Sequence, residues 1–205
     1  VELFADEEKF SDDMKREFAK NHVALRPYTE IENAVGKLSG RKKMLIDPER
    51  LSYALYKLIP DETEMIEKEN PEIIMKSVKN DIETEHIRRA HLKDAAAHTK
   101  FIYWLKENIG KTEITERSAS ARLEEFRKEQ DGYLGPSFEP ISAYYEHGAI
   151  VHYSASKESD ARLEKGHFLL TDTGGHYKDG STDITRTVAL GEVSYQEKED
   201  FTLVL

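Results

Sequence analysis

A glycine-rich segment late in the sequence places the tightest constraint on the fold. An apolar strand pattern at 168–173 leads into Gly174-Gly175 and a polar turn, and a second strand pattern covers 181–189. Two strand patterns joined by so short a polar segment predict an antiparallel hairpin. The fold must therefore contain an antiparallel sheet at this position.

Counting along this hairpin brings two carboxylates together. If the turn centres on 177–178, Asp172 lies directly opposite Asp183. If it centres on 178–179, Asp172 faces Thr185, and Asp183 is its diagonal neighbour on the same face. Both registers place the two aspartates side by side.

Two ionised aspartates on one face repel each other unless a cation or a shared proton offsets the charge. Oxygen ligands favour hard cations such as manganese or magnesium, and zinc or cobalt when a histidine joins. A pair of such metals would activate a water molecule and polarise a carbonyl. The same residues also fit a plain turn whose acidic side chains cap backbone amides, so spacing alone leaves both interpretations open. An EF-hand loop does not fit, because its closing glutamate is absent.

Helices precede the hairpin. The longest helical pattern runs over 81–108 and ends before Gly110, and a second begins near Thr115. After Gly135-Pro136, strand patterns at 141–145 and 149–153 lead into the hairpin. Two helices followed by an antiparallel meander predict an α+β fold. The expected buried positions of the helices are Ile87, Ala90, Ala97, Phe101, Trp104 and Leu105, then Ala119, Leu123 and Phe126.

The first 60 residues alternate helix and strand signals and predict part of an α/β layer. Expected elements are a helix at 12–21, a short apolar run at 23–25, an amphipathic helix at 28–38 and a strand at 43–46. Asp47-Pro48 would open a further helix that carries Leu51, Leu55 and Leu58 and stops before Pro60. The acidic stretch 61–70 is expected to connect two domains, 1–70 and 71–205.

Composition excludes several classes of protein. The chain has no cysteine, so it can form neither a disulfide nor a thiolate metal site. Its net charge of −10 argues against a nucleic-acid partner. No apolar run is long enough for a membrane span and no signal peptide is visible, so we expect a cytoplasmic protein. The chain starts at Val1 and stops within the apolar residues 201–205, and we expect both ends to be cut from a longer protein.

The residues from Asp172 to Thr187, Asp-Thr-Gly-Gly-His-Tyr-Lys-Asp-Gly-Ser-Thr-Asp-Ile-Thr-Arg-Thr, closely resemble the signature of aminopeptidase P, a metallopeptidase with the pita-bread fold. In that family both aspartates of the motif are metal ligands, and Asp172 and Asp183 match them. The segment 148–153 resembles the strand that carries an active-site histidine, which His152 matches. Residues 85–95 resemble the first helix of the catalytic domain, and 1–70 resemble the end of the creatinase-like α/β middle domain of the long, three-domain members. The resemblance thus implies the first half of a pita-bread domain, within an internal fragment.

The resemblance implies a metal-dependent enzyme that releases the N-terminal residue from peptides with proline in second position. Asp172 and Asp183 would bind two divalent metals, with Mn²⁺ expected first, and His152 would hydrogen-bond the substrate. The family's other ligands, a histidine and two glutamates, lie in the second half of the domain, which begins about where this chain ends. We therefore expect the isolated segment to bind metal weakly and to be inactive. Family members commonly pair through their non-catalytic domains, so a homodimer is a further expectation.

Alternative interpretations remain, both as other enzymes with the same fold and as a non-catalytic protein. A prolidase would cut only dipeptides, whereas a methionine aminopeptidase would lack the preceding middle domain. Creatinase lacks the aspartate pair that this chain keeps. Pita-bread domains that serve as non-catalytic binding modules in histone chaperones have lost the ligands. We assign no catalytic role to the remaining candidates, which are His86, His91, His98, His147, His176 and Arg186.

Overall fold

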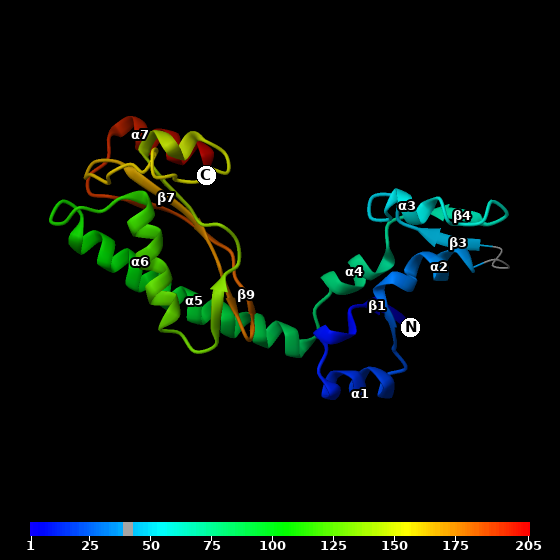
Figure 1. Ribbon diagram of the computed structural model, residues 1–205. Coiled ribbons are helices and arrows are strands. Elements are labelled where there is room, and N and C mark those ends of the chain that lie inside the picture. The colour runs from blue at the N-terminus through cyan, green and yellow to red at the C-terminus, as the bar shows by residue number, and fades with distance from the viewer. Residues whose placement is uncertain (39–42) are drawn as a thin grey trace. The chain divides into compact units, whose positions relative to one another are not determined.

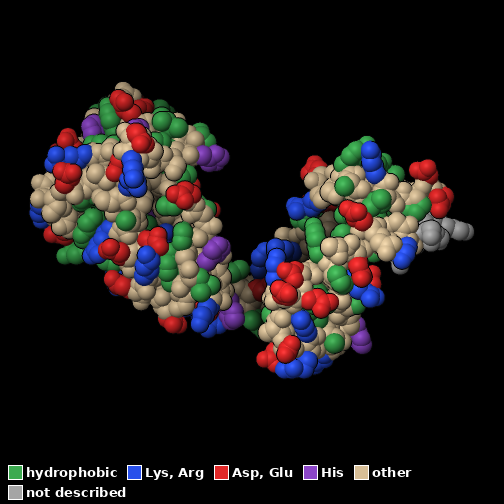
Figure 2. All heavy atoms as spheres, in the orientation of Figure 1, with side chains coloured by type: hydrophobic (Ala, Val, Ile, Leu, Met, Phe, Trp, Pro, Cys, Tyr) green, Lys and Arg blue, Asp and Glu red, His purple; other side chains and the backbone are tan. Residues whose placement is uncertain are grey.

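A computed structural model describes residues 1–38 and 43–205 (Figure 1). The chain divides into two compact units, Val1–Val78 and Lys79–Leu205. Across the described residues, no helix is both long and apolar enough to cross a membrane. Basic and acidic side chains are interspersed over the visible face of each unit (Figure 2).

The first unit contains two parallel strand pairs. Strand β1 (Glu2–Ala5) pairs with β2 (Ala24–Pro27), and α1 (Asp12–Lys20) makes the crossover between them. Strand β3 (Lys43–Ile46) pairs with β4 (Glu64–Glu67). Parallel strands need such long connections, which explains the alternation of elements seen in the sequence. The shorter elements are η1 (Glu7–Lys9), η2 (Tyr28–Glu30), α2 (Ile31–Gly36), α3 (Tyr53–Tyr56) and α4 (Pro71–Ser77).

Two expectations for this unit are wrong. The helix predicted from Asp47 is reduced to α3, which begins after its N-cap Ser52. The Asp47 carboxylate instead accepts hydrogen bonds from the backbone N–H groups of Glu49 and Asn70, at 3.1 and 2.9 Å, and so holds a turn. The acidic stretch 61–70 is not an open connection, because β4 lies within it and forms a ladder with β3.

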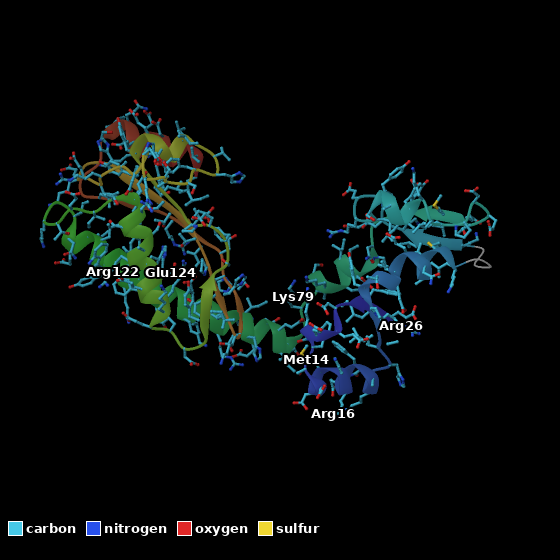
Figure 3. All side chains as sticks on the ribbon, viewed as in Figure 1. Met14, Arg16, Arg26, Lys79, Arg122 and Glu124 are labelled. Atoms are coloured by element: carbon cyan, nitrogen blue, oxygen red, sulfur yellow. The ribbon has the colours of Figure 1, made fainter. Side chains whose placement is uncertain are left out.

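The second unit begins with the two predicted helices. Helix α5 (Asp81–Asn108) starts at a capping box between Asn80 and Glu83 and ends before Gly110, whose φ of 76° favours glycine. Helix α6 (Glu116–Lys128) starts at the N-cap Thr115. On α6, the Arg122 guanidinium lies 4.4 Å from the Phe126 ring centroid (Figure 3 labels Arg122). The predicted buried faces are confirmed, except that Ile87 and Trp104 are only partly buried.

The helices cover one face of an antiparallel sheet with the strand order β10-β7-β6. Strand β7 (Phe168–Thr173) is central, between β6 (Ile141–Tyr144) and β10 (Ile184–Ala189). Alternate residues of β7 point toward the helices and are buried. The other residues, including Asp172, belong to the opposite face, which we call the open face. The core of the helix-covered side is Ala97, Phe101, Leu105, Ile109, Ile114, Ala119, Leu123, Phe126, Leu163, Leu169, Val188 and Leu190.

A second small antiparallel sheet extends the hairpin, in the order β5 (Tyr133–Pro136), β8 (Gly175–Tyr177), β9 (Gly180–Ser181). The strand predicted over 181–189 is therefore interrupted between β9 and β10. There Thr182 turns inward, and its backbone N–H donates to the Gly175 carbonyl at 2.9 Å. The last helix is α7 (Tyr195–Val204).

The strand predicted at 149–153 is absent. The 3-10 helix η3 (Tyr145–Ala149) and a turn replace it, and His152 adopts a left-handed φ of 56°. The cause is the buried carboxylate of Glu116, which accepts hydrogen bonds from the Tyr144 N–H at 2.7 Å and the Tyr153 hydroxyl at 2.8 Å. These bonds fold the segment back toward α6 and prevent an extended ladder.

Candidate metal site

The hairpin adopts the second of the two registers considered from the sequence. Asp172 lies opposite Thr185, and His176 lies opposite Ser181, so the turn centres on 178–179. Asp183 follows the end of β9 and precedes β10. The register thus places the two aspartates at adjoining positions of the hairpin.

The carboxyl groups of the two aspartates contact each other. Asp172 is half-buried, and its Oδ1 is buried without a hydrogen-bond partner. Asp183 is exposed overall, yet its pKa is raised, first by loss of hydration, then by the negative charge of Asp172 and a hydrogen bond between the two carboxyls. Carboxylates this close cannot both ionise freely without a counter-charge.

These oxygens fit part of a metal site. A buried carboxylate oxygen without a donor and a neighbouring carboxylate are hard ligands of the kind that divalent cations such as manganese bind. Over residues 1–38 and 43–205, no group of three or more histidine, aspartate or glutamate side chains could hold a metal ion. At this site, the described residues therefore add no third histidine or carboxylate to the pair.

A buried polar network lies beneath the pair, on the helix-covered side. Asp94 of α5 is fully buried, and Arg127 of α6 donates to it through Nε and Nη2, at 2.6 and 3.2 Å. Thr182 donates to the Asp94 Oδ2 at 2.5 Å, the Tyr177 hydroxyl donates to Oδ1 at 3.2 Å, and Arg127 donates to the Thr173 hydroxyl at 2.9 Å. Local sequence patterns did not predict this network. The available signal was an aspartate between Ala90 and Ala97 on the apolar stripe of a helix.

His152 is exposed in the turn that follows η3. No hydrogen bond or ion pair joins it to either aspartate within the described residues. The neighbouring Tyr153 is buried, and its hydroxyl donates to Glu116, so the backbone beside His152 is held firmly. The assignment of His152 as a substrate ligand remains a prediction.

The other histidines have local surroundings of their own. His98 is buried in the core with both ring nitrogens unpaired, and burial lowers its pKa to about 4. The His147 ring lies 2.8 Å from Glu116, and His176 lies 2.6 Å from the Ser181 hydroxyl. Arg186 lies opposite Thr171, so it belongs to the face away from Asp172.

Two sequence families match the chain. The pattern of metallopeptidase family M24 covers residues 85–205, and that of the creatinase/prolidase N-terminal domain covers residues 1–83. Among curated relatives, Xaa-Pro aminopeptidase 2 of Sus scrofa is 37% identical over 211 residues, which is 100% of this chain and 31% of that protein. Xaa-Pro aminopeptidase 1 of Dictyostelium discoideum is 36% identical, over 100% of this chain and 33% of that protein.

Solved structures give the same result. The X-prolyl aminopeptidase of Caenorhabditis elegans, described as a cytosolic enzyme with a di-nuclear active site, superposes with a TM-score of 0.86 at 29% identity, over 95% of this chain and 33% of that one. A Xaa-Pro dipeptidase from Bacillus anthracis superposes with a TM-score of 0.70 at 26% identity, over 89% of this chain and 50% of that one.

A helix pair on one face of an antiparallel sheet, with an aspartate pair at the end of its hairpin, defines the first half of a pita-bread domain, here preceded by part of a creatinase-like α/β domain. The chain belongs to metallopeptidase family M24. It spans about a third of the length of the curated relatives that it matches.

Proposed function

We propose that this chain supplies the first two metal-binding carboxylates, Asp172 and Asp183, of an aminopeptidase that releases the N-terminal residue from peptides with proline in second position. The observation that carries the proposal is the contact between the two carboxyls, with one buried oxygen left without a donor. Two Xaa-Pro aminopeptidases that match this chain from end to end support the specificity. As domain limits of the whole protein we keep 1–70 and 71–205 as a proposal, although the boundary between the two compact units falls eight residues later, after Val78.

Asp172 and Asp183 would hold two divalent metals, with Mn²⁺ as our first choice. Such metals, when bound, supply Lewis-acid activation of water and of the scissile carbonyl. His152 would donate a hydrogen bond to the substrate, a task that suits an imidazole near neutral pH. Because two carboxylates form an incomplete ligand set, the 205-residue chain alone should bind metal weakly and turn over no peptide.

Metal binding can be tested on the chain itself. In amide NMR spectra, substoichiometric Mn²⁺ should broaden the signals of residues around 172–184 selectively, because the ion is paramagnetic. Asp172→Asn and Asp183→Asn should each remove that selective broadening. Asp200→Asn, an exposed carboxylate on α7, is the matched control and should leave it unchanged. Uniform weak broadening over all acidic surfaces would contradict the proposal.

Specificity requires a chain that also contains the second half of the catalytic domain. Manganese-dependent release of the first residue from Xaa-Pro peptides of several residues, abolished by Asp172→Asn, is the expected result. Cleavage of dipeptides alone would favour a prolidase, a reading that the similarity to a Xaa-Pro dipeptidase supports. A well-folded protein without any turnover would favour a non-catalytic binding module. The expected homodimer and cytoplasmic location are separate predictions, to be checked by gel filtration and by fractionation.

A further inference from the structure

The buried pair formed by Asp94 and Arg127 holds two threonines that are direct neighbours of the aspartate pair. Thr173 follows Asp172, and Thr182 precedes Asp183. Arg127 donates to the Thr173 hydroxyl at 2.9 Å, and the Thr182 hydroxyl donates to Asp94 at 2.5 Å. One ion pair is therefore connected to both backbone segments that carry the candidate ligands.

The alternation of side chains explains this arrangement. Successive residues of an extended segment point to opposite faces. Thr173 and Thr182 are each 1% exposed on the helix-covered side, whereas Asp172 and Asp183 point away from it. Fixing the two hydroxyls thus fixes the backbone from which the two carboxylates project.

We call the hydrogen bonds that join Asp94 and Arg127 to Thr173 and Thr182 the clamp. Its effect is to oppose electrostatic repulsion. Two carboxylates in contact repel each other once both are ionised, and free segments would separate. The bidentate Arg127–Asp94 pair is only 4% and 0% exposed at its side chains, so its geometry is rigid and its hydrogen bonds are costly to break. The Thr182 hydroxyl also accepts from the Gly175 N–H at 2.9 Å, which joins the two segments directly.

We propose that Asp94 and Arg127 are positioning residues for the metal site, and that they act through the hydroxyls of Thr173 and Thr182 to keep the carboxylates of Asp172 and Asp183 together. This inference rests on the proposed function, because it assumes that the aspartate pair binds a cation. It adds residues on two helices, 33 positions apart, to the determinants of that site.

The test compares threonine-to-valine substitutions in the complete 205-residue chain. Thr173→Val and Thr182→Val each remove one link of the clamp and conserve volume. Thr171→Val is the matched control, because Thr171 has the same 1% exposure and lies on the same strand and face, but its hydroxyl donates to the Arg186 carbonyl and not to the network. Thr182→Ser retains the hydroxyl. The readouts are Mn²⁺-induced broadening of the amides around 172–184 and the urea unfolding midpoint.

We expect Thr173→Val and Thr182→Val to weaken the apparent Mn²⁺ affinity by about ten-fold, the size typical of an outer-shell ligand partner. Thr171→Val and Thr182→Ser should keep wild-type affinity, although Thr171→Val lowers the unfolding midpoint in its own right. Wild-type affinity in both clamp variants would overturn the inference while leaving the proposed function intact. Unfolding of both clamp variants would also overturn it, because the hydroxyls would then serve the fold as a whole. Absence of selective broadening in the wild-type chain would overturn the proposed function, and this inference with it.

Discussion

At the scale of single residues, Gly174 is the position with the least space. A Cβ there would lie 2.0 Å from the Thr182 carbonyl oxygen and 2.2 Å from the Ser137 hydroxyl. The backbone atom cannot yield without moving the segment that carries Asp183. We therefore predict that Gly174→Ala destabilises the second unit by about 3 kcal/mol or more, measured by urea unfolding followed through Trp104 fluorescence. Trp104 is the sole tryptophan of the chain and lies on α5.

Gly180 offers the control for this prediction. It belongs to the same hairpin, but a Cβ there would meet Ile87 at 3.7 Å, which is ordinary contact. Gly180→Ala should change the unfolding free energy by less than about 1 kcal/mol. Equal effects of the two substitutions would show that the close approach at Gly174 does not limit stability.

A second prediction at this scale concerns Asp183. Its pKa is raised in the folded chain, so the ionised form destabilises the fold at pH values above that pKa. Asp183→Asn should therefore raise the unfolding midpoint at pH 7 while it removes the Mn²⁺ response. The gain should shrink as the pH falls and the wild-type carboxyl becomes protonated. A lower midpoint at pH 7 would mean that the two carboxyls stabilise each other without a metal.

The aspartate pair was predictable from the sequence, whereas the buried hydrogen-bond network beneath it was not. Hairpin counting depends only on local spacing, so it located Asp172 next to Asp183. The network joins Asp94 to Thr182 across 88 positions, and no local pattern encodes such a separation. Only the tertiary packing of α5 and α6 against the hairpin reveals it.

At the scale of secondary-structure elements, α5 carries an acid-sensitive residue. His98 is 4% exposed, and burial is the main cause that lowers its pKa from 6.5 to about 4. A histidine whose pKa is lowered in the folded state remains neutral there. Stability is therefore lost as the pH falls below the pKa that the same histidine has in the unfolded chain. Between pH 6.5 and about pH 5, this residue should cost the second unit roughly 2 kcal/mol of unfolding free energy.

Urea unfolding at several pH values tests this expectation. His98→Leu should remove most of that loss, so its stability should decline less between pH 6.5 and pH 5 than that of the wild type. His91→Leu is the control, because His91 lies exposed on the same helix and donates only to the Ile87 carbonyl. Parallel pH profiles for wild type and His98→Leu would show that His98 is protonated without unfolding.

Elements with strong local signals were predicted well, and elements set by distant partners were not. Apolar periodicity and a terminal glycine predicted α5, and an apolar strand pattern predicted β7. The strand expected at 149–153 does not form, because Glu116, more than 30 residues away in the sequence, accepts a hydrogen bond from the Tyr153 hydroxyl. Strand β4 was not predicted, because its residues are mostly exposed and show no buried strand pattern. Its pairing with β3 stabilises it instead.

At the scale of the whole molecule, buried side chains are distributed unevenly between the two units. The hydrophobic core cluster lies entirely between Ala97 and Leu190. Of the described residues in Val1–Val78, only Ile46, Ile59 and Thr63 are buried. Since burial of apolar surface is the main source of stability, the second unit should be much the more stable of the two.

We predict that a chain consisting of residues 79–205 folds alone. Its Trp104 unfolding midpoint in urea should agree with that of the 205-residue chain, because the core cluster and the Asp94–Arg127 network are both internal to it. It should also retain the selective Mn²⁺ broadening around 172–184. Residues 1–78 alone should show little cooperative unfolding by circular dichroism, because so few of their described side chains are buried. A large fall in the midpoint of 79–205 would mean that the first unit contributes stability to the second, and the aspartate pair would then depend on both units.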